Sequence, residues 1–316
     1  MSTRPTVLVL GGGPDAEREV SIESSGAVAQ GVRDDGRFEV IYEIIGRPSI
    51  ESLRAVRGDV VFPVLHGPFG EGGGMQDLLE IDGRPYVGTG PGGARLAMDK
   101  LAGKLVASSR GVPTPIGACL NVADDTCPIA LPCVVKPVHE GSSVGLSLCR
   151  TDEDWDDAIR SVRADRTSNP ERAWMVEGLI AGRELTVGLL DLGAGLETVG
   201  VVEIEAAGGA YNFEAKYERD DTRYTVDPAL PAGVTELIRS QSVEVAKVVG
   251  VRHLARADFM LDDEGVAWFL EINTMPGFTA HSLLPMAAKS RGIGIGALCA
   301  GLVERALSER AGVRSE

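Results

Sequence analysis

The stretch ARADFMLDDEGVAWFLEIN, residues 255–273, carries the strongest structural pattern in the chain. Two apolar runs flank the polar letters DDEG, and this arrangement predicts a β-hairpin. A two-residue turn at Glu264 and Gly265 would set the register of its two strands. Because side chains alternate between the two faces of a strand, that register decides which polar residues meet.

Four polar side chains fall on one face of this predicted hairpin. Asp258 lies opposite Glu271, and Arg256 lies opposite Asn273. Carboxylate and amide oxygens suit a hard divalent cation, and Mg²⁺ at such sites also takes phosphate oxygens of a substrate. Arg256 is placed to hold a carboxylate or to stabilise an oxyanion. The alternative is a face of mixed charges, but apolar neighbours surround Glu271, and unpaired buried carboxylates are costly.

A second motif, KPVHEGSSVG from Lys136 to Gly145, follows the apolar run LPCVV. Its Gly-Ser-Ser-x-Gly loop has little side chain to pack, so its backbone N–H groups and hydroxyls are available to an anion such as phosphate. The alternative is a flexible Ser/Gly turn. A Walker A loop at residues 103–104 is excluded, because Met98 and Leu105 occupy positions that require Gly and Ser or Thr.

The N-terminal part of the chain predicts a parallel sheet. The runs TVLVL, FEVIYEI and DVVFPVLH are typical of buried strands, and helical patterns lie between them. A G-x-G-x-x-A turn at residues 11–16 resembles a dinucleotide fingerprint, although many tight strand-to-helix turns use glycine. The fold class is therefore α/β. We expect three segments: a Rossmann-like domain at 1–94, a central subdomain with the glycine-serine loop at 95–181, and a C-terminal subdomain at 182–316.

The composition narrows the range of partners. The 316 residues carry a net charge of -15, which disfavours nucleic acid and anionic membranes. No apolar run approaches the ~18 residues of a membrane helix, and the first residues do not match a signal peptide, so we expect a cytoplasmic protein. Five cysteines without a CxxC pair indicate neither a disulfide framework nor a zinc site.

Taken together, the predicted strand that ends at Lys136, the glycine-serine loop after it and the acidic hairpin at residues 255–273 resemble the pattern of the ATP-grasp superfamily. Within it, segments spread over nearly the whole chain are similar to D-alanine:D-alanine ligases, in the order GGPDAEREVS, LHGPFGE, AMDK, VVKPVHEGSSVG, EAKY, RADFML and FLEINTMPGFTAHSLLP. The chain departs from the family pattern at Gly72, Asp77 and residues 91–93. These departures bear on substrate affinity rather than on the type of reaction.

The resemblance implies a role for each matching residue. Residues that orient the first D-alanine and close the loop as a lid would be Glu17, Ser142 and Tyr217. ATP would be bound by Lys100, Lys136, Ser143, Glu177, Leu179, Glu184 and Lys216. Two Mg²⁺ ions, or Mn²⁺, would be held by Asp258, Glu271 and Asn273. The second D-alanine and the tetrahedral intermediate would be held by Arg256, Gly277, Ser282 and Leu283, with His66 in the substrate pocket wall.

The implied reaction ligates two D-alanines for peptidoglycan synthesis, and the family's usual homodimer is expected. The γ-phosphoryl group of ATP passes to the first D-alanine, and the amine of the second attacks the resulting acyl phosphate. Alternatives are an ATP-grasp ligase that uses D-lactate or D-serine as second substrate, and a nucleotide-binding module without turnover. An NAD-dependent oxidoreductase, with Glu43 after the second strand as ribose acceptor, would leave the lid and the hairpin unexplained.

Overall fold

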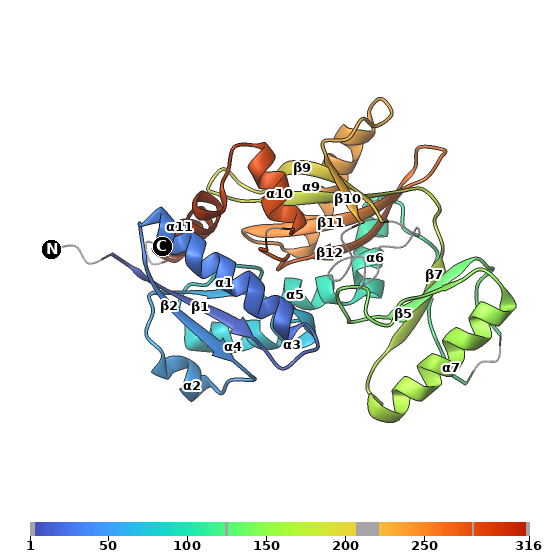
Figure 1. Ribbon diagram of the computed structural model, residues 1–316, viewed down its shortest axis with the longest axis horizontal. Coiled ribbons are helices and arrows are strands. Elements are labelled where there is room, and N and C mark those ends of the chain that lie inside the picture. The colour runs from blue at the N-terminus through green and yellow to red at the C-terminus, as the bar shows by residue number, and fades with distance from the viewer. Residues whose placement is uncertain (1–3, 124–125, 207–220, 280, 314–316) are drawn as a thin grey trace.

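The computed structural model describes residues 4–123, 126–206, 221–279 and 281–313, with side chains up to residue 309. Its strands form three sheets, which follow one another along the chain. Figure 1 shows the blue N-terminal layer beside the yellow and orange C-terminal sheet, with the green central sheet standing to one side. The architecture is α/β, as the sequence predicted.

The N-terminal layer is built on a parallel sheet of order β2-β1-β3, which confirms the predicted pattern. Its central strand is fully covered: Val7, Leu8 and Val9 are buried between helices on the two faces. The elements of this layer are β1 Thr6–Gly12, α1 Arg18–Asp35, β2 Glu39–Ile45, α2 Ile50–Ala55, β3 Val60–Pro63, α3 Gly67–Glu71, α4 Gly74–Asp82 and α5 Pro91–Met98.

The glycine turn after β1 uses its own donors internally. The N–H of Gly12 donates to Ser21 Oγ at 2.9 Å, and the N–H of Gly13 donates to the Ile45 carbonyl at 2.9 Å. Glu43 lies inside β2, opposite Leu10, so its predicted place after the second strand is wrong. A dinucleotide pyrophosphate would need those backbone donors free. The oxidoreductase alternative therefore loses its structural basis.

The central segment forms an antiparallel sheet of order β4-β7-β5-β6. Helix α7 begins with a capping box, in which Thr151 accepts from the Asp154 N–H and the Asp154 carboxylate accepts from the Thr151 N–H. Its buried Trp155 and Ile159 cover one face of the sheet. The elements are α6 Lys100–Ser109, β4 Gly117–Cys119, β5 Cys133–Pro137, β6 Ser147–Cys149, α7 Asp152–Ser168 and β7 Trp174–Gly178.

The C-terminal segment supplies the largest sheet, of order β10-β9-β8-β11-β12. Helix α9 packs its buried stripe, which includes Ile238, Val245 and Val249, into the core of this sheet. The elements are β8 Arg183–Leu190, β9 Glu197–Glu205, β10 Arg223–Val226, α9 Val234–Val249, β11 Leu254–Leu261, β12 Ala267–Asn273, α10 Leu283–Ser290 and α11 Ile295–Val313.

The β11–β12 hairpin has the predicted pairing at its site end and a different turn at its tip. Asp258 faces Glu271 and Arg256 faces Asn273, as predicted. The predicted two-residue turn is wrong: Asp262 N–H donates to the Val266 carbonyl at 3.1 Å, which leaves a three-residue loop.

A β-bulge between Asp258 and Phe259 corrects the register that this longer loop shifts. Phe259 pairs with Phe269, so Leu270 has no partner on the opposite strand. Bulges of this kind re-aim side chains near functional sites. The pairing at the site was therefore predicted correctly although the turn was not.

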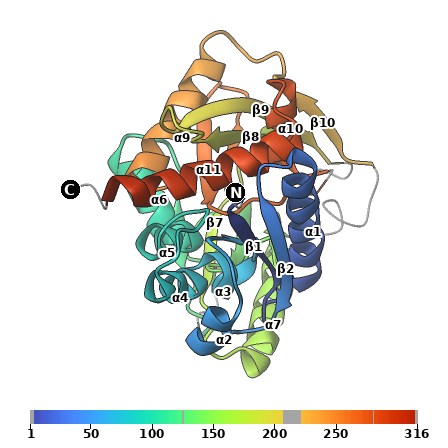
Figure 2. The same cartoon turned by 90° about the vertical axis from the view of Figure 1, so that its left-hand side faces the viewer.

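Helices α10 and α11 return to the N-terminal layer. Leu298, Leu302 and Val303 of α11 share one core with Val28 and Val32 of α1. Figure 2 shows α11 crossing the molecule next to α1. No single helix in the described segments is long and apolar enough to cross a membrane; only α10 and α11 taken together pass that test, and they meet at a bend of 100°.

Candidate active site

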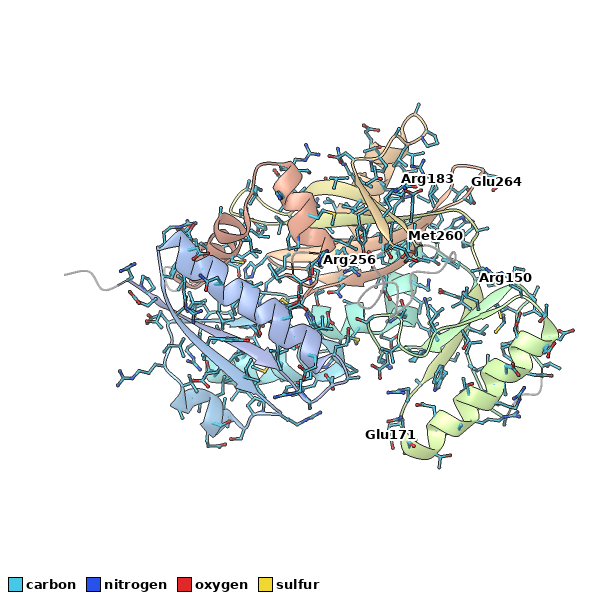
Figure 3. All side chains as sticks on the ribbon, in the orientation of Figure 1. Arg150, Glu171, Arg183, Arg256, Met260 and Glu264 are labelled. Carbon is cyan, nitrogen blue, oxygen red and sulfur yellow. The ribbon has the colours of Figure 1, made fainter. Side chains whose placement is uncertain are left out.

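A cavity of about 630 Å³ lies between the central sheet and the β11–β12 hairpin. In Figure 3, Arg256 lies near the middle of the molecule, Met260 lies further along β11, and Arg150 approaches from the central segment; all three line the cavity. Ten of the predicted site residues line it as well: Lys100, Lys136, Ser143, Glu177, Leu179, Glu184, Arg256, Asp258, Glu271 and Leu283.

The hairpin wall of the cavity carries charges that are already paired. Arg256 donates to Asp258 from Nε, at 2.9 Å and 3.3 Å from the two carboxylate oxygens, and from Nη2 at 2.8 Å. Thr186 Oγ1 donates to Asp258 at 2.5 Å. Lys100 Nζ lies 3.2 Å from Glu271 Oε2. Two carboxylates that face each other across strands would repel, and the two cations offset that repulsion.

The bulge at Leu270 determines which side chains this wall presents. Strict alternation would send Leu270 and Glu271 to opposite faces of the strand. Here both line the cavity, together with Met260 of the neighbouring strand. An apolar surface therefore lies directly beside the acidic one, a combination that suits a ligand with a flat apolar part and a charged part.

At the opposite wall, one buried carboxylate contacts two lysines, of which Lys136 lines the cavity and Lys104 does not. Lys136 Nζ on β5 donates to Glu177 Oε1 at 2.5 Å, and Lys104 Nζ on α6 lies 2.8 Å from Glu177 Oε2. Burial alone would lower the pKa of Lys136, but Glu177 and Glu271 outweigh it and hold that pKa above its ordinary value. Lys136 is therefore charged at neutral pH, as a phosphate ligand must be.

The glycine-serine loop, residues 140–145, covers one side of the cavity. Ser142 Oγ donates to Glu17 Oε1, which joins this loop to the residue before α1. Ser142 and Ser143 have φ of 51° and 56°, in the left-handed region that side chains seldom occupy. Strain of this kind persists where surrounding contacts fix the backbone.

Two cations and a glycine hold this loop at its base. Lys100 Nζ donates to the Glu140 carbonyl at 2.5 Å, and Arg172 Nη2 lies 2.9 Å from the Glu140 carboxylate. Gly145 has φ of 72°, and a Cβ there would lie 3.1 Å from the Trp174 ring. These contacts, and a position that only glycine fits easily, help to hold the loop.

The remaining predicted substrate residues gather between α1 and the loop before α10. His66 Nε2 lies 3.4 Å from Ser24 Oγ, which also accepts from the Phe278 N–H at 3.2 Å. Burial is the main cause that lowers the pKa of His66 to about 4, so its imidazole is neutral at pH 7. Ser282 Oγ accepts from the Thr279 N–H at 2.9 Å, and a Cβ on Gly277 would lie 2.7 Å from that Oγ.

The structure does not bring every predicted residue to the cavity wall. Among the described residues, those off the main cavity wall are Glu17, His66, Ser142, Asn273, Gly277 and Ser282. Asn273 lines a smaller adjoining pocket with Lys100 and Glu271. Leu179 uses its N–H on the Pro132 carbonyl at 3.1 Å. Lys216 and Tyr217 lie outside the described residues.

Sequence reasoning missed Lys104. It was set aside with the rejected Walker A pattern, yet it is only 5% exposed and contacts Glu177. The structure shows that Lys100, Gly103, Lys104 and Ala107 are the buried residues of α6, which the sequence alone does not reveal. Positions i, i+3, i+4 and i+7 form one face of a helix, so the spacing could have shown that Lys100 and Lys104 share a face, although not that this face is buried.

The departures from the family pattern lie away from the cavity. Asp77 forms an ion pair with Arg95, which joins α4 to α5. Gly93 lies in α5, where a Cβ would come within 2.6 Å of the Val249 carbonyl. These residues shape the packing of α4, α5 and α9, and none of them contributes a side chain to the cavity described above.

The donor set on the hairpin fits a hard cation. Asp258, Glu271 and Asn273 supply only oxygen ligands from two adjacent strands, and the register places Asp258 directly opposite Glu271. Mg²⁺ prefers such oxygens and completes its coordination with water and phosphate. The pairing of both carboxylates with cations is consistent with a site whose negative charge needs compensation.

Two sheets that close on a cavity of lysines and carboxylates, with a glycine-serine loop along its side, define the ATP-grasp class. A family model described as D-ala D-ala ligase C-terminus matches residues 121–304. A D-alanine--D-alanine ligase of Bordetella avium is 38% identical over 93% of this chain and 92% of its own length. One of Aromatoleum aromaticum is 39% identical over 95% of both chains.

Solved structures give the same result. A D-alanine--D-Alanine ligase from Bacillus anthracis complexed with ATP superposes with a TM-score of 0.82, at 27% identity, over 98% of this chain and 99% of its own. The VanG D-Ala:D-Ser ligase from Enterococcus faecalis superposes with a TM-score of 0.79, at 25% identity, over 96% and 100%. The chain belongs to the D-alanine–D-alanine ligase family.

Proposed function

We propose that the protein joins two D-alanines to D-alanyl-D-alanine, with ATP converted to ADP and phosphate, for peptidoglycan synthesis. The observation that carries this proposal is the cavity that Lys100, Lys136, Asp258 and Glu271 line together with residues of the glycine-serine loop. Relatives of similar length that are called D-alanine--D-alanine ligase support the choice of substrate.

A carboxylate is a poor electrophile, and phosphorylation by ATP overcomes this. The γ-phosphoryl group passes to the carboxylate of the first D-alanine, which gives D-alanyl phosphate and ADP. Lys100 and Lys136 attract the phosphates, since both line the cavity. Mg²⁺ held by Asp258, Glu271 and Asn273, or Mn²⁺ in its place, would neutralise charge on the phosphate oxygens.

The amine of the second D-alanine then attacks the acyl phosphate, and phosphate leaves. Arg256, which hydrogen-bonds to Asp258, would stabilise the oxyanion together with the N–H of Gly277. Glu17 and Ser142, which bond to each other, would orient the first D-alanine and close the lid. Closure excludes water, which would otherwise hydrolyse the intermediate.

Product analysis tests this function directly. We expect incubation with ATP, Mg²⁺ and D-alanine to yield the dipeptide by mass spectrometry, with one phosphate released per peptide bond. Parallel reactions with D-alanine plus D-lactate or D-serine test the alternative second substrates, which the similarity to a D-Ala:D-Ser ligase makes worth measuring. ATP binding without any ligated product would contradict the proposal.

The proposal includes Tyr217, which favours the dipeptide over the ester by resemblance to the family. Replacement by phenylalanine, Tyr217→Phe, is expected to slow dipeptide formation. An unchanged rate would remove this residue from the mechanism.

We also propose the three-domain division at 1–94, 95–181 and 182–316. It is supported by the positions of the three sheets, each of which lies inside one segment. A homodimer and a cytoplasmic location complete the proposal, the first from the family resemblance and the second from the need for ATP. Sedimentation of the purified protein tests the dimer.

A further inference from the structure

We propose that Lys104 is a positioning residue for nucleotide binding: it shares Glu177 with Lys136 and so leaves a net positive charge beside the nucleotide. This inference rests on the proposed use of ATP and names a residue that does not line the cavity. Glu177 and Lys136, in contrast, both line it. Lys104 would therefore act through its neighbours and not by contact with the ligand.

The geometry divides the two oxygens of Glu177 between two lysines. Lys136 contacts Oε1 at 2.5 Å, and Lys104 contacts Oε2 at 2.8 Å. One negative and two positive charges leave one positive charge for the group. Without Lys104, Glu177 and Lys136 would neutralise each other, and the cavity wall would attract a polyphosphate less strongly.

The burial of the group makes a purely stabilising role a poor explanation. The side chains of Lys104, Lys136 and Glu177 are 6%, 9% and 4% exposed. Removing charges of this kind from water costs about as much as their attraction returns, and apolar replacements are often neutral or stabilising. A helix that needed only packing at this position would be served by leucine or methionine.

The environment of Lys104 also makes it sensitive to pH. Burial is the largest cause that lowers its pKa to about 8, opposed by the carboxylate of Glu177 and assisted by the charge of Lys136. The charged groups that face it are Glu177 on β7, Lys136 on β5 and Glu271 on β12. Lys104 therefore changes charge within an accessible range of pH, whereas the pKa of Lys136 is raised.

The first test separates binding from turnover. For Lys104→Met we expect KM for ATP to rise about tenfold while kcat stays within about twofold, because a buried charge partner is lost without any change at the reacting atoms. Lys104→Arg should restore most of the affinity. The matched control is Lys247→Met on α9, an exposed lysine, which should leave both constants unchanged.

A double-mutant cycle shows whether Lys104 acts through Glu177. Glu177→Gln removes the carboxylate, and Lys104→Met should then add little further to KM for ATP. Full additivity of the two substitutions would overturn the proposal, as would a folded Lys104→Met protein with wild-type KM. If Lys104→Met does not fold, the Lys104→Arg and Glu177→Gln proteins still test it through the pH profile.

The pH profile is the readout that a structural role would not move. As pH rises through about 8, Lys104 loses its proton, so KM for ATP should rise in the wild type. Arginine stays charged, so the ratio of wild-type KM to Lys104→Arg KM should increase with pH. A constant ratio would overturn the proposal.

Calorimetric titration with ATP distinguishes the two levels of failure. No ATP binding by the wild-type protein would refute the proposed function itself. Wild-type binding that Lys104→Met leaves unchanged would refute only the role of Lys104.

Discussion

The β11–β12 hairpin and the glycine-serine loop form two sides of one cavity in opposite ways. The hairpin lies in a five-stranded sheet, and its acidic side chains are held by Arg256, Thr186 and Lys100. Among the described residues, no strand pairs with residues 140–145, and the loop is contacted by Glu17, Lys100 and Arg172. Paired charges on one side and a loop proposed to act as a lid on the other suit a reaction that must admit substrates and then exclude water.

The largest effect should come from breaking the hairpin side. Glu271→Ala removes a proposed metal ligand and the partner of Lys100, so we expect kcat to fall by about 10³-fold or more with the fold retained. Steady-state kinetics at saturating Mg²⁺ measure this. Glu264→Ala, at the exposed tip of the same hairpin, is the matched control and should behave as wild type. Near-normal activity of Glu271→Ala would refute the assignment of the site.

A smaller and different effect should come from the loop side. Gly145→Ala places a methyl group 3.1 Å from the Trp174 ring at a φ of 72°, which strains the loop that we propose to act as a lid. We expect kcat to fall on the order of tenfold to hundredfold and phosphate release to exceed dipeptide formation, because water reaches the intermediate.

The control for this variant is Gly83→Ala, which has φ of 81° but no atom near the added methyl group. It should lower stability by about 1 kcal/mol and leave the ratio of phosphate to dipeptide unchanged. The same ratio of phosphate to dipeptide in Gly145→Ala and in the wild type would contradict the proposal that the loop acts as a lid over the cavity.

His66 tests whether a buried residue off the cavity wall affects stability rather than chemistry. Its pKa is about 4 in the folded protein against 6.5 unfolded, so the unfolded chain binds more protons between these values. The contribution of His66 to the free energy of unfolding is therefore fully present above pH 6.5. It decreases by about 3 kcal/mol as the pH falls toward 4. Chemical unfolding should show that the free energy of unfolding depends more steeply on pH in the wild type than in His66→Gln across this range. The same pH dependence in both proteins would contradict a buried, neutral His66.

The smallest effect is expected at Asp77, one of the departures from the family pattern. Its ion pair with Arg95 is about half exposed, so Asp77→Gly should cost less than about 2 kcal/mol, from the lost pair and from glycine in a helix. KM for D-alanine should stay within about twofold, because Asp77 does not reach the cavity. A larger change in KM would show that the departure affects substrate binding after all.

The sequence predicted the pairing of the polar residues on the hairpin correctly, but it predicted the turn of the hairpin wrongly. Pairing of Asp258 with Glu271 followed from an assumed two-residue turn, whereas the real loop is longer by one residue and a bulge at Leu270 compensates. Period-two alternation contains no information about a bulge, because the extra residue depends on packing against neighbouring strands. The sequence therefore could not predict that the adjacent residues Leu270 and Glu271 both line the cavity.

Local patterns were sufficient where backbone chemistry determines the structure. The sequence predicted β1, β3 and the glycine-serine loop because buried strands are rich in apolar residues and turns are rich in glycine and serine. Lys104 was missed for the opposite reason. Its role depends on Glu177, which is distant in sequence and reaches it only through the fold.

The joint core of α1 and α11 has a consequence for synthesis on the ribosome. Val28 and Val32 emerge early, yet the helix that covers them is made after nearly all the rest of the chain. Until then the nascent N-terminal layer exposes these apolar side chains to solvent, where chaperones can bind them. Proteins truncated before residue 295 should accordingly be bound by chaperones or degraded rather than accumulate as partly folded chains.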